Sequence, residues 1–305
     1  MHMWTSPHGR TLPAIGARTL IMGILNVTPD SFSDGGQLPS PAAAVAKARD
    51  LVVAGADVLD LGGESTRPGA ATISVDEELS RVLPVLTALR DALPECPISI
   101  DTYKSEVADA AIEHGADLIN DVWGLTAGMS ASDLDAWREA ARNTSSTKML
   151  PALPQMATVA ARRQCPVILM HNRRDRNYGY FWTDVLLDLK VSVTIARAAG
   201  LAEQQLWLDP GFGFAKNVGQ NLEILRELNR ICALGYPVLV GTSRKSTIGG
   251  VLGTAVDHRI EGGGATVVWA IQQGCQMVRV HDVREMARFV RMTDAIKAGL
   301  RFLPT

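Results

Sequence analysis

The chain has 305 residues, of which 47% are hydrophobic, and a formal net charge of −2. This length and composition can bury a large core, so we expect one large α/β domain or two smaller ones. No basic stripe or polybasic run is present, which argues against nucleic acid or a membrane surface as a partner.

Membrane spans and disulfides are not expected either. No apolar stretch approaches the roughly 18–20 residues that a membrane span needs, and the first residues lack the layout of a signal peptide. The four cysteines stand singly, without metal or redox spacing, at Cys96, Cys165, Cys232 and Cys275. We therefore expect a protein of the reducing cytoplasm.

Short, continuous apolar runs recur along the chain and predict buried strands. Because these runs are continuous rather than alternating, they favour a parallel sheet that is covered on both faces. The predicted strands are Thr19–Leu25, Val58–Leu61, Ile98–Ile100, Leu118–Ile119, Val167–Met170, Leu206–Leu208, Val238–Val240 and Met277–Val280.

Amphipathic stretches between these runs predict helices, and several of them end at a glycine, as helices commonly do. Eight strands that alternate with helices predict a (β/α)8 TIM barrel of the α/β class in a single domain. A doubly wound open sheet is the competing architecture. The predicted helices include Pro41–Ala54, Val75–Ala92, Ser105–His114, Trp182–Ala199, Val218–Leu234 and Gly264–Gln273.

Nearly every predicted strand is followed by a polar residue, and this favours the barrel. In a barrel the carboxyl ends of the strands meet at one mouth, where active sites of this fold lie. In an open sheet the same residues would spread along an edge. The polar groups are Asn26, the segment 62–70, Asp101, Asn120 with Asp121, His171, Asp209, the segment 242–246, and Arg279 with His281.

The segment between Leu125 and Pro151 does not follow this alternation of predicted strands and helices. Ser132–Ala141 is predicted as a short helix with Ser132 as its N-cap, and the remainder is predicted as an exposed loop. Because the segment follows Asn120, it could lie beside the mouth of the barrel.

Four polar groups at strand ends, Asp101, Asn120, Asp209 and Lys245, suggest a site for a planar ligand. A carboxylate that is flanked by apolar residues is costly to bury alone. Two carboxylates, an amide and an ammonium can satisfy a ring that carries several N–H and C=O groups. The structural alternative is an aspartate that caps a turn or pairs with an arginine of the barrel.

Asn26, Arg279 and His281 suggest an anion site. Arg279 and His281 stand two residues apart on a strand and therefore point the same way, and arginine presents a planar fork suited to phosphate oxygens. The alternative is a buried ion pair of Arg279 with Asp282 or a neighbour. The segment 242–250 contains Lys245 and leads into the start of a helix. A helix N-terminus next to a lysine is a natural place for an anion such as a carboxylate.

Two polar, glycine-flanked loops, 26–36 and 63–70, can act as lids that close over a reactive ligand. The alternative is that both are ordinary surface loops. Phe214 can stack on a flat ligand, and it can equally be plain packing.

The order and sequence of these segments resemble the dihydropteroate synthases of the folate pathway. The similarity covers about residues 18–297, which leaves 1–17 as an N-terminal extension and 298–305 as a C-terminal tail of this pterin-binding barrel domain. Residues 126–150 are an insertion relative to the family pattern, and Gly263 stands where relatives often carry a hydroxyl residue. The motifs are MGILNVTPDSFSDGG (22–36), DLGGESTRPGA (60–70), SIDTYKSEVADAA (99–111), LINDVWG (118–124), VILMHNR (167–173), LDPGFGFAKN (208–217), LVGTSRKSTIGG (239–250) and MVRVHDV (277–283).

The resemblance implies that 4-aminobenzoate reacts with (7,8-dihydropterin-6-yl)methyl diphosphate to give 7,8-dihydropteroate and pyrophosphate. It implies Mg²⁺ as the cofactor, with Asn26 as a ligand of the metal, and a homodimer. It also implies the following roles: catalysis by Asp101, Asp209, Lys245 and Arg279; pterin binding by Asp101, Asn120, Met170, Asp209, Gly241 and Lys245; diphosphate binding by Asn26, Thr66, Arg279 and His281; aminobenzoate binding by Thr66, Arg67, Pro68, Phe214 and Ser246; and a lid that includes Asp30, Phe32 and Asp34.

Two other functions would use the same kind of barrel. A pterin-binding methyltransferase that hands a methyl group to a corrinoid protein would share the pterin carboxylates. It would not need the two loops or the Ser-Arg-Lys helix start, all of which are present. A non-catalytic binding or regulatory protein would bind pterin without releasing pyrophosphate.

Overall fold

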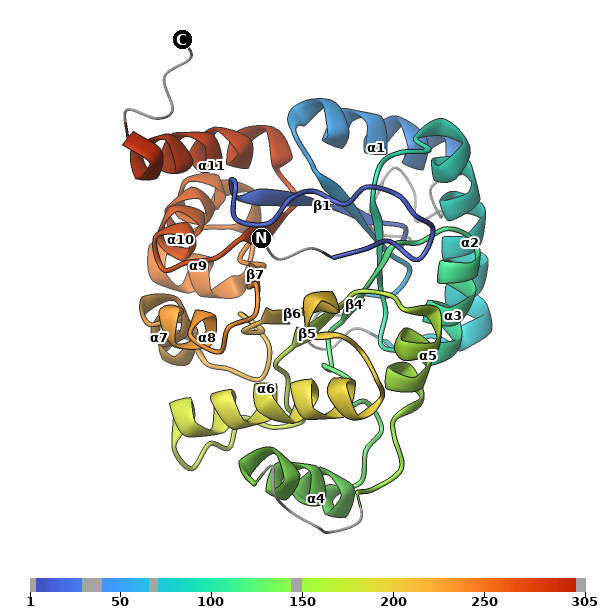
Figure 1. Cartoon of the computed structure of the whole chain (residues 1–305). Coiled ribbons are helices and arrows are strands. Elements are labelled where there is room, and N and C mark those ends of the chain that lie inside the picture. The colour runs from blue at the N-terminus through green and yellow to red at the C-terminus, as the bar shows by residue number, and fades with distance from the viewer. Residues whose placement is uncertain (1–3, 29–39, 66–70, 144–149, 300–305) are drawn as a thin grey trace.

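The computed structural model describes residues 4–28, 40–65, 71–143 and 150–299. In this part of the chain eight parallel strands form a ring that helices surround (Figure 1). The strands are β1 (Leu20–Asn26), β2 (Val58–Gly62), β3 (Ile98–Asp101), β4 (Leu118–Asp121), β5 (Val167–Met170), β6 (Leu206–Asp209), β7 (Leu239–Val240) and β8 (Met277–Val280). The helices are α1 (Pro41–Ala54), α2 (Val75–Ala92), α3 (Ser105–Glu113), α4 (Ala131–Arg142), α5 (Gln155–Arg163), α6 (Phe181–Ala198), α7 (Val218–Arg226), α8 (Asn229–Cys232), α9 (Ser246–Leu252), α10 (Ile260–Gln272) and α11 (Val283–Ala298).

The strand order closes the sheet on itself. Neighbouring strands follow the order β6-β5-β4-β3-β2-β1-β8-β7, and an isolated parallel bridge from Leu208 to Val238 joins the two outer strands. The predicted (β/α)8 barrel is therefore confirmed, and the open-sheet alternative is wrong.

The register of the strands brings the predicted polar residues to one level. Asn26 at the end of β1 is paired with Gly62 of β2, and Gly62 is in turn paired with Asp101 of β3. Asp101 is paired with Asn120 of β4. The carboxyl ends of four consecutive strands thus place an amide, a carboxylate and a second amide side by side along the barrel rim.

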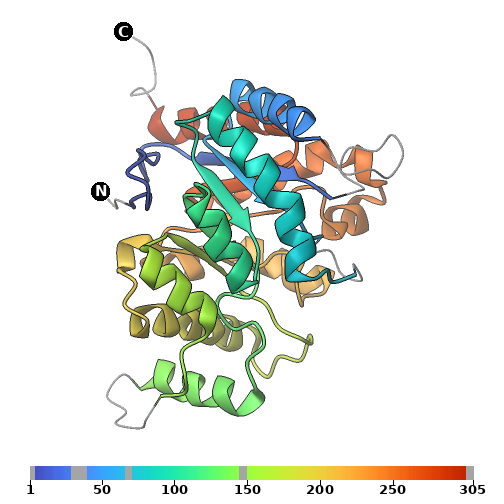
Figure 2. The same cartoon turned by 90° about the vertical axis from the view of Figure 1, so that its right-hand side faces the viewer.

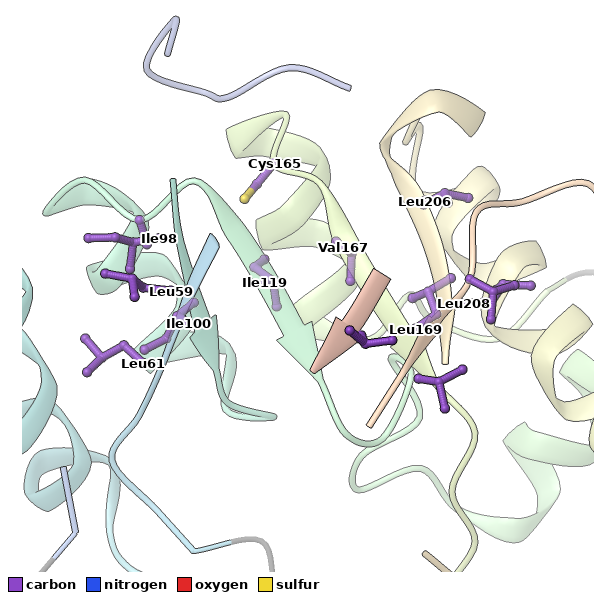
Figure 3. Close-up of a cluster of buried hydrophobic side chains, with 14 of the residues drawn as sticks. Leu59, Leu61, Ile98, Ile100, Ile119, Cys165, Val167, Leu169, Leu206 and Leu208 are labelled. Atoms are coloured by element: carbon purple, nitrogen blue, oxygen red, sulfur yellow. The ribbon is translucent and has the colours of Figure 1, made fainter. Parts of the chain in front are cut away.

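Strand side chains alternate between two apolar clusters, which is why the strands read as continuous apolar runs. Leu59, Leu61, Ile98 and Ile100 belong to a buried cluster that they share with apolar residues of the surrounding helices (Figure 3). The alternate positions fill the interior of the barrel near its amino-terminal end with Met22, Val58, Leu118, Ile168, Trp207, Leu239 and Met277.

Residues 4–18 cross the amino-terminal end of the barrel interior (Figure 1). The ring centroid of Trp4 lies 4.9 Å from that of Trp207, and both side chains are buried. The buried carboxylate of Asp117, just before β4, accepts a hydrogen bond from Arg10 Nε at 2.8 Å. This segment therefore covers apolar surface that would otherwise face water at the end opposite the polar rim.

The helix predicted between Leu125 and Pro151 is present as α4, but its N-cap is Ser130 and not Ser132. The Ser130 hydroxyl accepts from the backbone N–H of Asp133, so Ser132 lies inside the first turn. Trp137 of α4 is fully buried. The helix lies against α6, outside the ring of barrel helices (Figures 1 and 2).

Two other helices differ from the prediction. The predicted helix 218–234 is two helices, because the backbone leaves helical geometry at Glu227. Helix α10 begins at Ile260 rather than at Gly264, although its glycines resemble a loop. An ideal Cβ at Gly264 would lie 2.4 Å from the ring of Phe289. Glycine is present there because α10 and α11 pack too closely for a side chain.

The described residues contain neither a disulfide nor a membrane-crossing helix. All four cysteines are free, and Cys165 and Cys275 are buried. None of the described helices combines the length and the apolar character that a membrane crossing requires.

Candidate active site

The carboxyl ends of the strands surround a cavity of about 310 Å³. It receives side chains from β1, β3 and β8 and from the loops that follow β2, β6 and β7. The structure thus brings together residues that are far apart in the sequence. The predicted site residues that line the cavity are Asn26, Asp101, Phe214, Gly241, Lys245, Ser246, Arg279 and His281.

Arg279 of β8 joins two buried carboxylates beside this cavity. Its Nε donates to Asp60 Oδ2 and its Nη2 donates to Asp101 Oδ2, each at 2.5 Å. Burial lowers the pKa of Arg279, but the two carboxylates outweigh burial and the pKa is raised. The predicted alternative is right that Arg279 is ion-paired and wrong about Asp282, which pairs with Arg244.

Asp60 of β2 was missed as a site residue. It is 0% exposed, and the Oδ2 atom that binds Arg279 also accepts from Asn120 Nδ2 at 3.1 Å. Asp60 stands inside the apolar run Val58–Leu61, which predicts a buried strand. The signal was present, because a carboxylate in the middle of a buried strand requires a partner.

Asp101 presents an acceptor to the cavity. Its Oδ2 binds Arg279, whereas its buried Oδ1 has no hydrogen-bond partner among the described residues. An unpaired buried oxygen costs about 1–3 kcal/mol, and a ligand N–H donor would remove that cost. Burial raises the pKa of Asp101, and Arg279 offsets part of the rise.

Asp209 ends β6, and Lys245 follows β7 and lines the same cavity. Asp209 Oδ1 accepts from the backbone N–H of Gly211 at 2.7 Å, and burial raises the pKa of Asp209 to about 6. Lys245 Nζ lies 4.1 Å from the ring centroid of Phe214, within cation–π distance. Asp209 and Asn120 are buried and are absent from the lining of the cavity.

Asn26 and His281 flank Arg279 along the wall that β1 and β8 form. An ideal Cβ at Gly62 would lie 3.2 Å from Asn26 Oδ1, so a side chain at Gly62 would press on this amide oxygen. His281 Nδ1 lies 3.0 Å from Ser243 Oγ. An amide, a guanidinium and an imidazole therefore line one side of the cavity, as expected for an anion site.

Arg259, just before α10, also lines the cavity and was not predicted. Its Nη1 donates to the backbone carbonyl of Arg244 at 2.9 Å. An ideal Cβ at Gly249 of α9 would lie 2.4 Å from Arg259 Nη2. The paired glycines of α9 were therefore a signal that a large side chain packs on this short helix.

Met170 does not line this cavity. It lines a neighbouring cavity of about 340 Å³ together with His171, Arg173 and Asp188, and α4 contributes Arg138. The segment 126–138 therefore forms a wall of a second cavity that shares the end of β5 with the barrel mouth.

Several predicted residues lie outside the described part of the chain. Within that part, no cluster of three or more His, Cys, Asp or Glu residues could hold a metal ion. Asn26, the predicted metal ligand, is described and supplies an amide oxygen. The residues outside the described ranges are Asp30, Phe32, Asp34, Thr66, Arg67 and Pro68.

Comparison with known proteins agrees with this geometry. Residues 22–281 match the family model described as pterin binding enzyme. The dihydropteroate synthase of Bacillus subtilis is 48% identical over 279 residues, which are 92% of this chain and 89% of that protein. A Clostridium difficile dihydropteroate synthase structure, determined in the presence of pteroic acid, has a TM-score of 0.82 at 45% identity and covers 93% of this chain and 99% of its own.

A second solved structure is equally similar in fold. The Xanthomonas albilineans dihydropteroate synthase with 4-aminobenzoic acid has a TM-score of 0.83 at 39% identity, and the match covers 97% of this chain and all of that one. These similarities extend over nearly the whole chain and include every strand that carries a site residue. The chain therefore belongs to the pterin binding enzymes and, within them, to the dihydropteroate synthases.

Proposed function

We propose that the 310 Å³ cavity joins 4-aminobenzoate to (7,8-dihydropterin-6-yl)methyl diphosphate and releases pyrophosphate. One observation carries this proposal: Arg279 stands between the carboxylates of Asp60 and Asp101, at the wall of the cavity. The site thus places the guanidinium of Arg279, which can stabilise the departing diphosphate, next to the carboxylate of Asp101, which can accept hydrogen bonds from ring N–H groups. Two similar solved structures, one determined in the presence of pteroic acid and one with 4-aminobenzoic acid, support the same assignment.

The pterin ring is assigned to the buried polar groups. Asp101, whose Oδ1 lacks a donor, accepts from the ring, and Asp209, Asn120 and Lys245 supply further acceptors and donors. Gly241 lines the cavity and allows close approach, and Met170, which lines the neighbouring cavity, is assigned an apolar contact with the ring. We assign to Asp101 and Asp209 the stabilisation of positive charge that develops on the pterin.

The diphosphate is assigned to Asn26, Thr66, Arg279 and His281. The C–O bond to the diphosphate breaks, a C–N bond to the aromatic amine forms, and the amine loses a proton. An aromatic amine is a weak base and needs little deprotonation before it attacks. Catalysis therefore depends on charge stabilisation and positioning rather than on a strong base.

Mg²⁺ is the proposed cofactor, with Asn26 as its protein ligand. Mg²⁺ prefers oxygen ligands, keeps several waters and is usually bound through one or two carboxylates plus substrate phosphates. Asn26 offers an amide oxygen, so the other ligands would be waters and oxygens of the diphosphate. When bound, Mg²⁺ neutralises charge on the diphosphate.

The aminobenzoate is assigned to the part of the cavity where Phe214 lies beneath Lys245. Ser246 opens α9 and lines the cavity there. The same proposal includes residues of both loops that lie outside the described ranges. These are Thr66, Arg67 and Pro68 for the aminobenzoate, and Asp30, Phe32 and Asp34 for a lid.

A homodimer is also proposed. Exposed apolar side chains gather on α7, α9, α10 and α11, which pack against one another (Figure 1). A second copy of the chain would cover this face, and Trp269→Glu should shift the mass in sedimentation equilibrium from dimer to monomer. The exposed apolar side chains of this face are Val218, Leu222, Val251, Leu252, Trp269, Met292 and Ile296.

We further propose a cytoplasmic location, which the four free thiols support.

One assay tests the proposed reaction against its alternatives. The protein is incubated with 4-aminobenzoate, the pterin diphosphate and Mg²⁺, and pyrophosphate and dihydropteroate are measured together. We expect equal amounts of both products. Pterin binding without pyrophosphate release would favour a non-catalytic binding protein. A second incubation, with a methylated pterin and a corrinoid protein, tests the other alternative, and methyl transfer there would favour the methyltransferase.

A further inference from the structure

Lys216, in the loop between β6 and α7, is a buried cation that the proposed reaction does not use. It is 3% exposed, and its Nζ donates to His171 Nδ1 at 2.8 Å. The same atom donates to the backbone carbonyls of Gly211 at 3.1 Å and Phe214 at 3.2 Å. An ammonium carries three N–H donors, so each donor has one acceptor. Displacing any of the three acceptors would leave a buried donor unpaired.

His171, directly after β5, anchors this lysine to the rest of the barrel. Because Nδ1 accepts from Lys216, the ring proton is on Nε2, which faces Asp188 Oδ2 of α6 at 3.4 Å. Arg173 Nε donates to the same carboxylate oxygen at 2.6 Å. Burial lowers the pKa of His171 to about 4, so the ring is neutral near pH 7 and Nδ1 stays an acceptor.

The turn 211–214, whose carbonyls bind Lys216, is packed between the backbone of His171 and the side chain of Lys245. An ideal Cβ at Gly211, where φ is +66°, would lie 1.9 Å from the carbonyl oxygen of His171. An ideal Cβ at Gly213 would lie 2.9 Å from Lys245 Cδ. The turn carries Phe214, which lines the 310 Å³ cavity. Its backbone therefore has little room to move as long as its carbonyls remain bonded.

We propose that Lys216 is a positioning residue that holds Phe214 against Lys245 and so shapes the aminobenzoate side of the cavity. This inference rests on the proposed role of Phe214. Lys216 contacts no reacting group, and it acts through the carbonyl of Phe214 itself. Loss of this contact frees the aromatic ring to shift, which weakens aminobenzoate binding more than pterin binding.

Steady-state kinetics of Lys216→Met tests the proposal, since Met keeps the apolar stem and removes the three donors. We expect the KM for 4-aminobenzoate to rise at least tenfold and the KM for the pterin diphosphate to rise less than threefold. Arg10→Met is the matched control, because it removes a cation from a buried carboxylate at the opposite end of the barrel. The control should lower Tm without changing either KM.

A pair of His171 variants keeps the proposal testable even if Lys216→Met does not fold. His171→Asn places an amide oxygen near the position of Nδ1 and can still accept from Lys216, whereas His171→Leu cannot. We expect His171→Asn to keep a near-normal KM for aminobenzoate and His171→Leu to raise it. Equal KM values in both His171 variants, or an unchanged KM in an active Lys216→Met enzyme, would overturn the inference. An inactive wild-type enzyme would instead refute the proposed function.

Discussion

Arg279 Nε donates to the carboxylate of Asp60, which has no exposed surface. The same carboxylate oxygen binds Asn120, so one buried atom orients a residue proposed for the pterin and a residue proposed for the diphosphate. Arginine carries five N–H donors, and Nε and Nη2 are the nitrogens that bind the two aspartates. The geometry of the two halves of the site is thereby coupled.

Asp60→Asn should lower kcat at least tenfold, which corresponds to about 1.4 kcal/mol. The amide keeps the volume of the carboxylate but weakens the charge that orients Arg279. The KM for 4-aminobenzoate should stay within threefold of wild type, because Asp60 is absent from the cavity lining. Steady-state kinetics with both substrates decides this, and a kcat within twofold of wild type would contradict it.

Asp101→Asn should also lower kcat more than tenfold. The substitution removes a negative charge from a group that we assign to cation stabilisation, and it leaves Arg279 with one carboxylate. The measurement is single-turnover pyrophosphate release at saturating substrates. A decrease smaller than tenfold, or about 1.4 kcal/mol, would show that Asp101 does not have this role.

The kcat/KM for 4-aminobenzoate should decrease as the pH rises from about 7 to 9. Burial lowers the pKa of Lys216 to about 7, so above that pH the amine has two N–H donors for its three acceptors. The charged groups around it oppose one another, with Asp209 and Asp188 raising the pKa and Arg173 and Lys245 lowering it. The kcat/KM for 4-aminobenzoate should fall over this range in the wild type and stay flat in Lys216→Met.

Stability should fall between about pH 6.5 and pH 4 because of His171. Burial lowers its folded pKa to about 4 from 6.5, so over this window the unfolded chain takes up a proton that the folded chain does not. The loss approaches about 3 kcal/mol at the acid end. Urea unfolding across this range should show a shallower pH dependence in His171→Asn than in the wild type.

Trp4→Ala should destabilise the protein without affecting the site. The substitution removes a buried ring next to Trp207 at the amino-terminal end of the barrel and costs about 3–5 kcal/mol. Tm should fall by several degrees, while kcat and both KM values at 25 °C remain unchanged. A changed KM would mean that the segment 4–18 influences the opposite end of the barrel.

Much of the fold was predictable because its signals are local. The strands β5 and β8 begin and end where the apolar runs do, and polar residues follow them directly. Helix α10 was placed too late, because the reason for its glycines is the distant ring of Phe289. Local patterns cannot show such a contact.

The site was predictable in part for the same reason. Residues at strand ends, such as Asp101 and Arg279, were recognised because polar groups there are conspicuous. Asp60 was missed because it lies within an apolar run and its partner is 219 positions away. The contact between His171 and Lys216 joins two loops that are 45 positions apart, and only the closed barrel brings them together.

The bridge between Leu208 and Val238 gives the barrel a seam, where β6 meets a strand of only two residues. Asp209 ends the strand on one side of this seam, and Lys245 follows the strand on the other. A pterin ring bonded to both would act as a non-covalent cross-link across the joint that has the fewest backbone pairs. Substrate binding would then strengthen the barrel where its own sheet is weakest, and the empty and loaded enzyme would differ in how often this seam opens.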